Sequence, residues 1–285
     1  MILICCHFIS SAQNSLVMVG GEHPYDMFLD SRMYPADSLD EVVYRVNYSY
    51  SFVTDTSGNI TDRGIGTLEI GRNVTKYYNY YYFLTDSLVR SGRIRHYMDN
   101  SNNITPNVSD PVTYYESFIH RRSRDVWTCT GRIVTQDFLY EDKIPPIEWR
   151  ISDSISVILG YSAVMAECTF RGRDYVAWFT TEIPVSAGPW KFSGLPGLIL
   201  CVSDSEGYYR FEATEAYATS CPLLLPDYLY LKAKRKKYMQ ARALYYTNRK
   251  QAQVLYLVNT EWYVEYEAGE LMDTKPLGND FIERE

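Results

Sequence analysis

Alternation of apolar and polar residues predicts that the chain is built mainly of β-strands from about residue 40 onward. Residues 40–52 repeat with a period of two, which places five apolar side chains on one strand face: Val42, Tyr44, Val46, Tyr48 and Tyr50. The turn sequence DTSGN then leads into a second strand over residues 60–70. Residues 74–84 are an aromatic run that begins a strand or a helix. Further strands are expected at 114–119, 125–134, 151–159, 162–170 and 174–181.

One helix is expected, over residues 226–250, where five apolar residues recur at helical spacing: Tyr228, Leu231, Tyr238, Ala241 and Tyr245. This segment contains the basic run KAKRKK, 232–237. A solvated helix face is the simpler interpretation of the run, and a patch for a membrane surface or a nucleic acid is the alternative. Residues 254–265 are expected to form a last strand, and the polar residues 86–112 a long surface loop.

The segment GLPGLIL, residues 194–200, predicts a rigid entry into a buried hairpin. Pro196 and Gly197 are typical of a type II turn, in which Gly197 would have a positive φ. Residues 198–202 continue as an apolar strand, and residues 208–213 return beside it. Such a hairpin is most simply part of the core. The alternative is that its glycines let the backbone approach a ligand or partner closely.

These elements predict a mainly β (α+β) fold: a curved antiparallel sheet or partial barrel, with one long C-terminal helix packed on it. We find no internal repeat or linker, so residues 13–285 are interpreted as a single domain. The 285 residues are 46% hydrophobic and 22% charged, which is typical of a globular chain. A net charge of −7 argues against a general nucleic-acid binder. The 27 tyrosines predict an aromatic wall, half exposed on a sheet.

The N-terminus predicts export. Residues 2–9 are apolar, and Ser10 and Ala12 stand at the −3 and −1 positions of a cleavage site before Gln13. We interpret residues 1–12 as the remnant of a signal peptide, which gives a periplasmic or secreted protein. A short buried strand is the alternative. No later stretch is apolar and long enough to span a bilayer. In an oxidising compartment the four remaining cysteines are disulfide candidates, with buried thiols as the alternative: Cys129, Cys168, Cys201 and Cys221.

The sequence contains no motif that indicates a catalytic site, a metal site or a cofactor. A hydrolase would require His96 or His120 close to a serine, a cysteine or a carboxylate. The best polar candidates are Arg171 and Arg173, which share one face of the predicted strand. Two arginines so placed can hold a carboxylate or phosphate, and pairing with acidic residues of neighbouring strands is the simpler interpretation. Two tryptophans, Trp178 and Trp190, are candidates for lining a groove.

Residues 177–207, AWFTTEIPVSAGPWKFSGLPGLILCVSDSEG, resemble the signature of the GLPGLI family of exported Bacteroidota proteins, most of which have no assigned activity. Residues 160–175, with FRGR, are similar to the family as well. The resemblance implies an envelope location and a β-rich fold, and it supplies no catalytic residue. Family members often carry a second cysteine shortly before the position of Cys168, where this chain has Ala163. That departure makes Cys129 a candidate partner of Cys168.

We therefore expect an exported, non-enzymatic binding or carrier module that holds an apolar or peptide-like ligand or an outer-membrane partner protein. It is expected to be a monomer that does not bind nucleic acid or span the membrane. The alternatives are an interaction protein that pairs through a sheet edge and, third, an envelope hydrolase. The residues expected to form the ligand or partner surface are Arg171, Arg173, Trp178, Glu182, Trp190, Gly194, Leu195, Pro196 and Gly197.

Overall fold

The protein folds around a twelve-stranded sheet with the strand order β12-β6-β5-β4-β3-β2-β1-β11-β10-β9-β8-β7. The structure, a computed structural model, describes residues 36–53, 61–80, 116–124, 126–134, 136–227 and 230–256. The strands are β1 (Ala36–Val53), β2 (Thr61–Gly71), β3 (Val74–Asn79), β4 (Ser117–Arg121), β5 (Trp127–Ile133), β6 (Gln136–Asp142), β7 (Arg150–Ile158), β8 (Tyr161–Phe170), β9 (Arg173–Thr180), β10 (Leu198–Asp204), β11 (Tyr209–Pro226) and β12 (Leu231–Lys234). β12 pairs parallel to β6, and all other neighbouring strands in this sheet are antiparallel.

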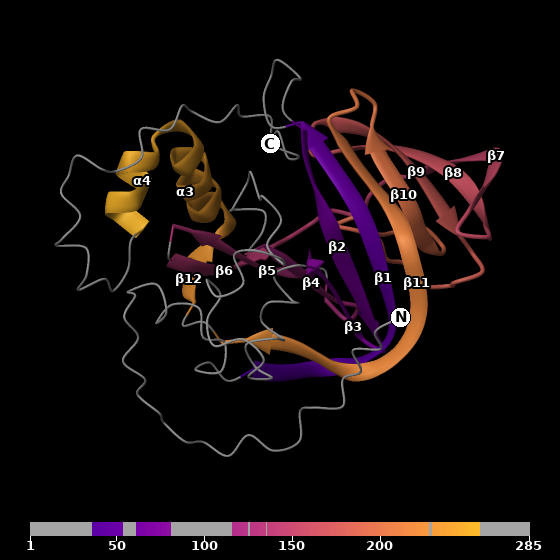
Figure 1. The fold of residues 1–285 in the computed structure, drawn as a ribbon, viewed down its shortest axis with the longest axis horizontal. Coiled ribbons are helices and arrows are strands. Elements are labelled where there is room, and N and C mark those ends of the chain that lie inside the picture. Colours follow the sequence, from indigo (N-terminus) through magenta and orange to yellow (C-terminus); the bar gives the residue numbers. More distant parts are fainter. Residues whose placement is uncertain are drawn as a thin grey trace, which may run out of the picture.

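Two long strands form the middle of the sheet. β1 and β11 have 18 residues each and pair from Ala36↔Pro226 to Phe52↔Tyr209. Figure 1 shows them as long curved ribbons, with β7 to β10 on one side and the shorter strands β4 to β6 on the other. Register shifts along the pair mark bulges, which increase the bend of a strand.

The connection from β6 to β7 requires the sheet to curl. β6 ends at Asp142 and β7 begins at Arg150, so seven residues join them. The two strands are ten positions apart in the sheet, which is about 48 Å in a flat sheet at about 4.8 Å per strand. Seven residues reach at most about 28 Å. The sheet therefore bends back on itself, and its two halves enclose the core.

Residues 181–197, which join β9 to β10, help to fill this core, and we call them the inner connection. Trp190 of the inner connection contacts Phe118 of β4 and Phe170 of β8, with ring centroids 6.2 Å and 5.9 Å apart. Phe192 packs against Tyr175 of β9 at 4.8 Å. The inner connection thus joins strands from opposite halves of the sheet through buried aromatic contacts.

Most of the tyrosines on the described strands are core residues rather than an exposed wall. Tyr48 and Tyr238 are fully buried, and Tyr77 is 7% exposed. The rings of Tyr77 and Tyr238 cover Gly66 and Gly131, where a β-carbon would overlap the ring. Gly66 on β2 thus makes space for Tyr77 of the neighbouring strand β3, and Gly131 on β5 makes space for Tyr238, which lies on the helix after β12.

The prediction of one long C-terminal helix on an antiparallel sheet is wrong. Residues 226–250 begin with the end of β11, include the four-residue strand β12, and then form the short helix α3 (Arg235–Thr247). A second short helix, α4 (Arg249–Tyr256), follows Asn248, whose φ of −149° interrupts the helix. Pairing with β6 overrides the helical pattern of Leu231–Lys234, because the pairing satisfies their backbone groups in the sheet.

Other predictions also required correction. The return strand expected at 208–213 continues to Pro226, and β6 was not predicted. Val254–Tyr256 is helical, whereas a strand was expected over 254–265. The signal remnant 1–12, the loop 86–112 and residues 257–265 lie outside the described residues. Among the described residues, no helix combines the length and the apolar character that a membrane crossing requires.

Candidate functional site

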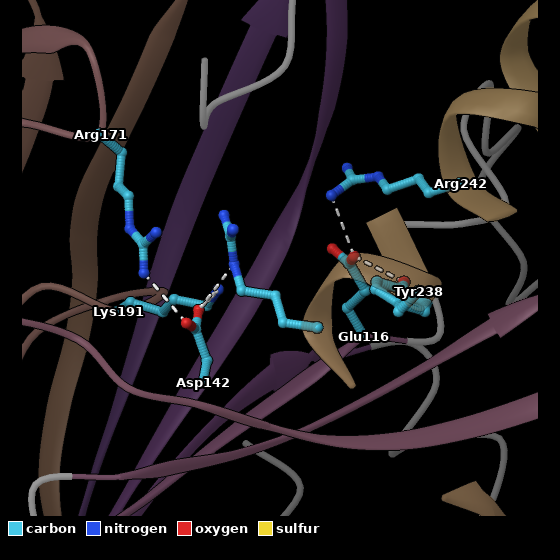
Figure 2. A network of polar contacts seen from close by, with 7 residues as sticks. Glu116, Asp142, Arg171, Lys191, Tyr238 and Arg242 are labelled. Atoms are coloured by element: carbon cyan, nitrogen blue, oxygen red, sulfur yellow. Dashed lines mark hydrogen bonds and ion pairs between the residues drawn. The ribbon is translucent and has the colours of Figure 1, made fainter. Parts of the chain in front are cut away.

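A buried ion cluster lies where the two halves of the sheet meet (Figure 2). At its centre is Asp142, the last residue of β6, which is 2% exposed. Lys191 Nζ donates a hydrogen bond to Asp142 Oδ2 at 2.8 Å, and Arg171 Nη2 donates one to Oδ1 at 3.0 Å. Arg235 Nε, from the first turn of α3, lies 3.4 Å from Oδ2. One carboxylate therefore joins four segments that are far apart in the sequence.

Lys191 is the most unusual member of this cluster, because lysine is almost never fully buried unless it is paired. Its side chain is 2% exposed, and its Nζ lies over two aromatic rings, 5.1 Å from the centroid of Phe118 and 5.3 Å from that of Trp190. The ring faces and the Asp142 carboxylate replace the water that a lysine loses on burial. The charge is thus held in a fixed position inside the core.

A second buried carboxylate, Glu116, forms a separate group of contacts with α3. Glu116 Oε1 accepts a hydrogen bond from the Tyr238 hydroxyl at 2.9 Å, and Arg242 Nη1 lies 3.2 Å away. Tyr238 and Arg242 are both on α3, so this contact attaches the helix to the residue that precedes β4 (Figure 2). Because the ions in these two groups form pairs across the core, they are suited to holding segments together.

The two candidate arginines bind different carboxylates. Arg171 lies in the β8–β9 turn with φ +50° and reaches Asp142. Arg173 Nη1 donates to Asp204 Oδ2 at 3.1 Å and to Glu206 Oε2 at 3.3 Å, and the Arg173 side chain is 1% exposed. Its guanidinium also lies 4.9 Å from the ring centroid of Tyr209. The two guanidinium groups are therefore not placed around one ligand. Arg173 instead pairs with the acidic residues Asp204 and Glu206.

The other candidates are spread over β9 and the inner connection. Trp178 is half buried opposite Met165 and Cys201 on the neighbouring strands. Glu182 is exposed, and its Oε1 accepts a hydrogen bond from the Ser162 N–H at 2.8 Å. Trp190 is 5% exposed and has φ +52°.

The signature turn is built by contacts within the protein. Leu195 is 1% exposed, whereas Pro196 is exposed. Gly194 has φ +97°, and its N–H donates to Ser186 Oγ at 2.8 Å. Gly197 is not among the glycines with positive φ, which differs from the predicted type II turn. Glycine is required there because a β-carbon would overlap the carbonyl oxygen of Thr180 on β9. The close approach that Gly197 permits is thus to the protein's own backbone.

The four cysteines are buried on four different strands, and none of them is bonded to another of the four. Cys129 lies on β5 and Cys168 on β8, in opposite halves of the sheet. Burial raises the pKa of the Cys168 thiol to about 12, and the nearby Asp174 carboxylate adds to this shift. Burial likewise raises the pKa of Cys201. Both thiols are therefore protonated at neutral pH and are poor nucleophiles. Their disulfide pairing in an oxidising compartment stays a prediction.

The described histidine that the hydrolase alternative named is His120, and its ring lies flat on Trp127 at a centroid distance of 4.6 Å. His96 lies outside the described residues. Among the residues that the structure describes, no group of three or more His, Cys, Asp or Glu side chains could hold a metal ion.

An exposed apolar strand lies at one edge of the sheet. β7 pairs with β8 on one side, and no described strand pairs with its other side. Three of its apolar side chains are largely in solvent: Ile151 is 54% exposed, Ile155 68% and Val157 72%. The next residue in the alternation, Leu159, is 43% exposed in the turn to β8. Edge strands are normally protected by charges or proline, and a row of exposed aliphatic side chains on an edge strand is unusual.

Sequence reasoning missed the centre of the ion cluster and the edge. Asp142 and Lys191 carry no local signal, because an isolated acidic or basic residue in a strand or loop reads as solvated. The one available hint was a lysine between two aromatic residues in the segment PWKF, which is unusual for an exposed loop. β7 was predicted as a strand, but its position at the edge depends on the sheet order.

A family model described as a protein of unknown function (Porph_ging) matches residues 161–201, which run from the start of β8 into β10. No curated protein matches the chain significantly. Two solved structures are similar, titled "Structure of PNGF-II in P21 space group" and "Structure of PNGF-II in C2 space group". Each has 16% sequence identity and a TM-score of 0.48, over 70% of this chain and 32% of that chain. This chain therefore spans about a third of the length of those solved chains. The segment from β8 into β10 is thus similar to a Bacteroidota-associated family of unknown function.

Proposed function

We propose that this protein is a non-enzymatic interaction module of the bacterial envelope, of GLPGLI type, that binds an extended segment of a partner protein along the outer edge of β7. The single observation that carries the proposal is the exposed apolar edge itself. A strand that pairs on one side only presents unsatisfied N–H and C=O groups, which a partner strand can pair with by β-augmentation.

The side chains of β7 define the chemistry of the partner. Ile151, Ile155 and Val157 are exposed apolar residues, and the serines at 152, 154 and 156 alternate with them. A partner strand that alternates apolar and small polar residues would place its apolar side chains beside these three. A second copy of this chain fits the edge less well. If two β7 strands paired antiparallel with their apolar residues on the same face, Asp153 would lie opposite an apolar residue or opposite the Asp153 of the other copy.

An irregularity in β7 limits where the partner pairs. The register with β8 shifts between Ile151 and Ile155, and the Ser154 N–H donates to Ser152 Oγ at 3.1 Å within the shift. Bulges of this kind discourage indiscriminate edge pairing. Residues 155–158 pair regularly with β8, so they are the part of the edge that a partner strand would extend.

The carrier function with a groove at the GLPGLI hairpin receives less support. Leu198, Ile199 and Leu200 of that hairpin are fully buried within the protein, and Leu195 is 1% exposed. The apolar surface of the signature segment is therefore already used in the core. Export of the chain is part of the proposal, and the apolar N-terminal residues 2–9 and the similarity to a Bacteroidota-associated family support it.

A model strand peptide tests the proposal. The probe is a fluorescent peptide of alternating valine and threonine with a lysine at each end, titrated against the full chain and followed by anisotropy. The variant I155K/V157K is expected to weaken binding by tenfold or more, because it removes apolar contacts worth roughly 1 kcal/mol each. The matched control is V254K/L255K, which changes two residues of α4 that are 68% and 58% exposed.

Hydrogen–deuterium exchange on the same complex shows where the peptide lies. We expect slowed exchange of amides in residues 155–158 and no change at α4. Equal binding by both double variants, or protection elsewhere with none over 155–158, would show that β7 is not the partner surface.

A further inference from the structure

The C-terminal part of the described fold carries a concentration of positive charge. Residues 231–256, which form β12, α3 and α4, contain eight basic and no acidic residues, although the whole chain has a net charge of −7. This charge is local, because fields between exposed charges are screened within about 8–10 Å at physiological salt. A partner at this surface therefore meets a basic face on an acidic protein.

Four lysines of this region point into solvent. Lys232 and Lys234 alternate along β12, and Lys236 and Lys237 belong to the first turn of α3. A described carboxylate that neighbours them is the exposed Glu141 of β6, which lies opposite Lys234 in the register of the two strands. Arg235 turns the other way, toward the buried Asp142.

Helix stability does not explain these lysines. The positive end of the helix dipole favours acidic residues in the first turn and disfavours basic ones. α3 has no acidic residue in its first turn, and its N-cap residue Lys234 makes no side-chain capping hydrogen bond. A local rule that is broken in this way is typical of a functional surface.

An exposed apolar pair lies on the adjacent helix. Val254 is 68% exposed and Leu255 58%, both near the end of α4. α4 packs against α3 and runs back beside it, so its last turn lies toward the end of α3 that follows β12 (Figure 1). Basic residues beside exposed aliphatic ones form the combination that peripheral membrane helices use.

We propose that these six residues (Lys232, Lys234, Lys236, Lys237, Val254 and Leu255), the basic surface, bind the anionic headgroups of a lipid membrane from its surface. The lysines would contact the lipid phosphates, and the two aliphatic side chains would enter the boundary between headgroups and acyl chains. This inference is independent of the proposed function of β7. Lipid is favoured over nucleic acid because a nucleic acid offers no apolar layer for Val254 and Leu255.

The test measures co-sedimentation of the full chain with two kinds of vesicle: phosphatidylcholine alone, and phosphatidylcholine with about 30% phosphatidylglycerol. Each lysine near an anionic membrane is worth about fivefold in partitioning. Charge reversal in K236E/K237E is therefore expected to reduce binding to anionic vesicles by more than tenfold. The matched control R72E/R150E makes the same change in net charge at two exposed arginines away from the basic surface, and it should reduce binding little.

A second pair of variants tests the apolar contribution. V254S/L255S is expected to weaken binding to anionic vesicles severalfold, whereas I155S/V157S on β7, where the exposure is similar, should not. Raising the salt concentration from 50 to 300 mM should release the protein. Thermal melts by circular dichroism confirm that all variants are folded.

Three results would overturn the proposal. The first is that the full chain shows no preference for anionic vesicles at 50 mM salt. Residues 257–285 contain eight acidic and two basic residues, and this result would follow if they occupied the basic surface in place of lipid. The second is equal loss of binding in K236E/K237E and R72E/R150E. The third is binding to soluble polyphosphate as tight as binding to vesicles and unaffected by V254S/L255S, which would assign the surface to a soluble polyanion.

Discussion

Removing Asp142 is expected to destabilise the protein more than removing Lys191, although the two are partners in one buried ion pair. Lys191→Met leaves the Asp142 carboxylate with Arg171 at 3.0 Å and Arg235 at 3.4 Å. Asp142→Asn leaves Lys191, Arg171 and Arg235 without the carboxylate that lies between them. The difference between the two variants therefore measures how far one acid organises three cations.

The magnitude follows from the geometry. Two cations about 5 Å apart repel by about 3 kcal/mol at an effective dielectric constant of about 20. Breaking a buried ion pair from one side costs about 3–5 kcal/mol, and Asp142→Asn should reach the upper part of that range. Lys191→Met should cost about 1–2 kcal/mol, because methionine keeps an unbranched apolar chain between Phe118 and Trp190. The expected difference is about 3 kcal/mol, or roughly a hundredfold in the unfolding equilibrium.

Urea denaturation followed by circular dichroism measures the free energy of unfolding of each variant. The double variant D142N/K191M should cost less than the sum of the two single variants, because it leaves fewer unpaired charges. Arg72→Met is the control, since Arg72 forms a surface ion pair with Glu41 at 3.3 Å and should cost under about 1 kcal/mol. A loss in Lys191→Met as large as in Asp142→Asn, or strict additivity, would refute the assignment of Asp142 as the organising residue.

Two glycines and one carboxylate give the remaining predictions. Gly197→Ala should lower the free energy of unfolding by about 2 kcal/mol or more, because the new β-carbon meets the Thr180 carbonyl oxygen. Gly160 has φ +82° and open space around it, so Gly160→Ala should cost only about 1 kcal/mol. Urea denaturation measures both losses. A larger loss in Gly160→Ala would contradict the conclusion that the contact with Thr180 requires a glycine at position 197. Burial raises the pKa of Asp40, but backbone N–H groups of Asn73 (2.6 Å) and two other residues lower it more, so its folded pKa lies below 3.8. The carboxylate thus stabilises the fold above about pH 4, and this contribution is lost as the pH falls through the folded pKa. Asp40→Asn should cost about 1 kcal/mol at pH 7 and much less near pH 2, and an equal cost at both pH values in urea denaturation would refute this.

Local chemistry in the sequence determined most of the strands. Apolar and polar residues alternate in three predicted strands, 40–52, 162–170 and 174–181, because the two faces of each strand meet different environments. These predictions agree almost entirely with the bounds of β1, β8 and β9. The turn before Arg173 was not predicted, because Arg171 and Arg173 were assigned to one face of the same strand; Gly172, where φ is +75°, is the local signal that could have indicated the turn. Periodicity and turn residues act within a few positions of the chain, so reading them requires no knowledge of the fold.

Tertiary structure decided the order of the strands, and with it both candidate surfaces. Whether β7 lies at the edge or in the middle depends on the pairing of β11 with β1, and hydrogen bonds between strands leave no mark at a fixed sequence distance. The same long-range pairing turned Leu231–Lys234 from the expected helix into β12. Asp142 and Lys191 are 49 residues apart and meet only because the sheet curls around the inner connection. Periodicity and turn residues thus limit which segments can form strands and turns, whereas the closure of the sheet sets which charges are buried together and which apolar side chains stay in solvent.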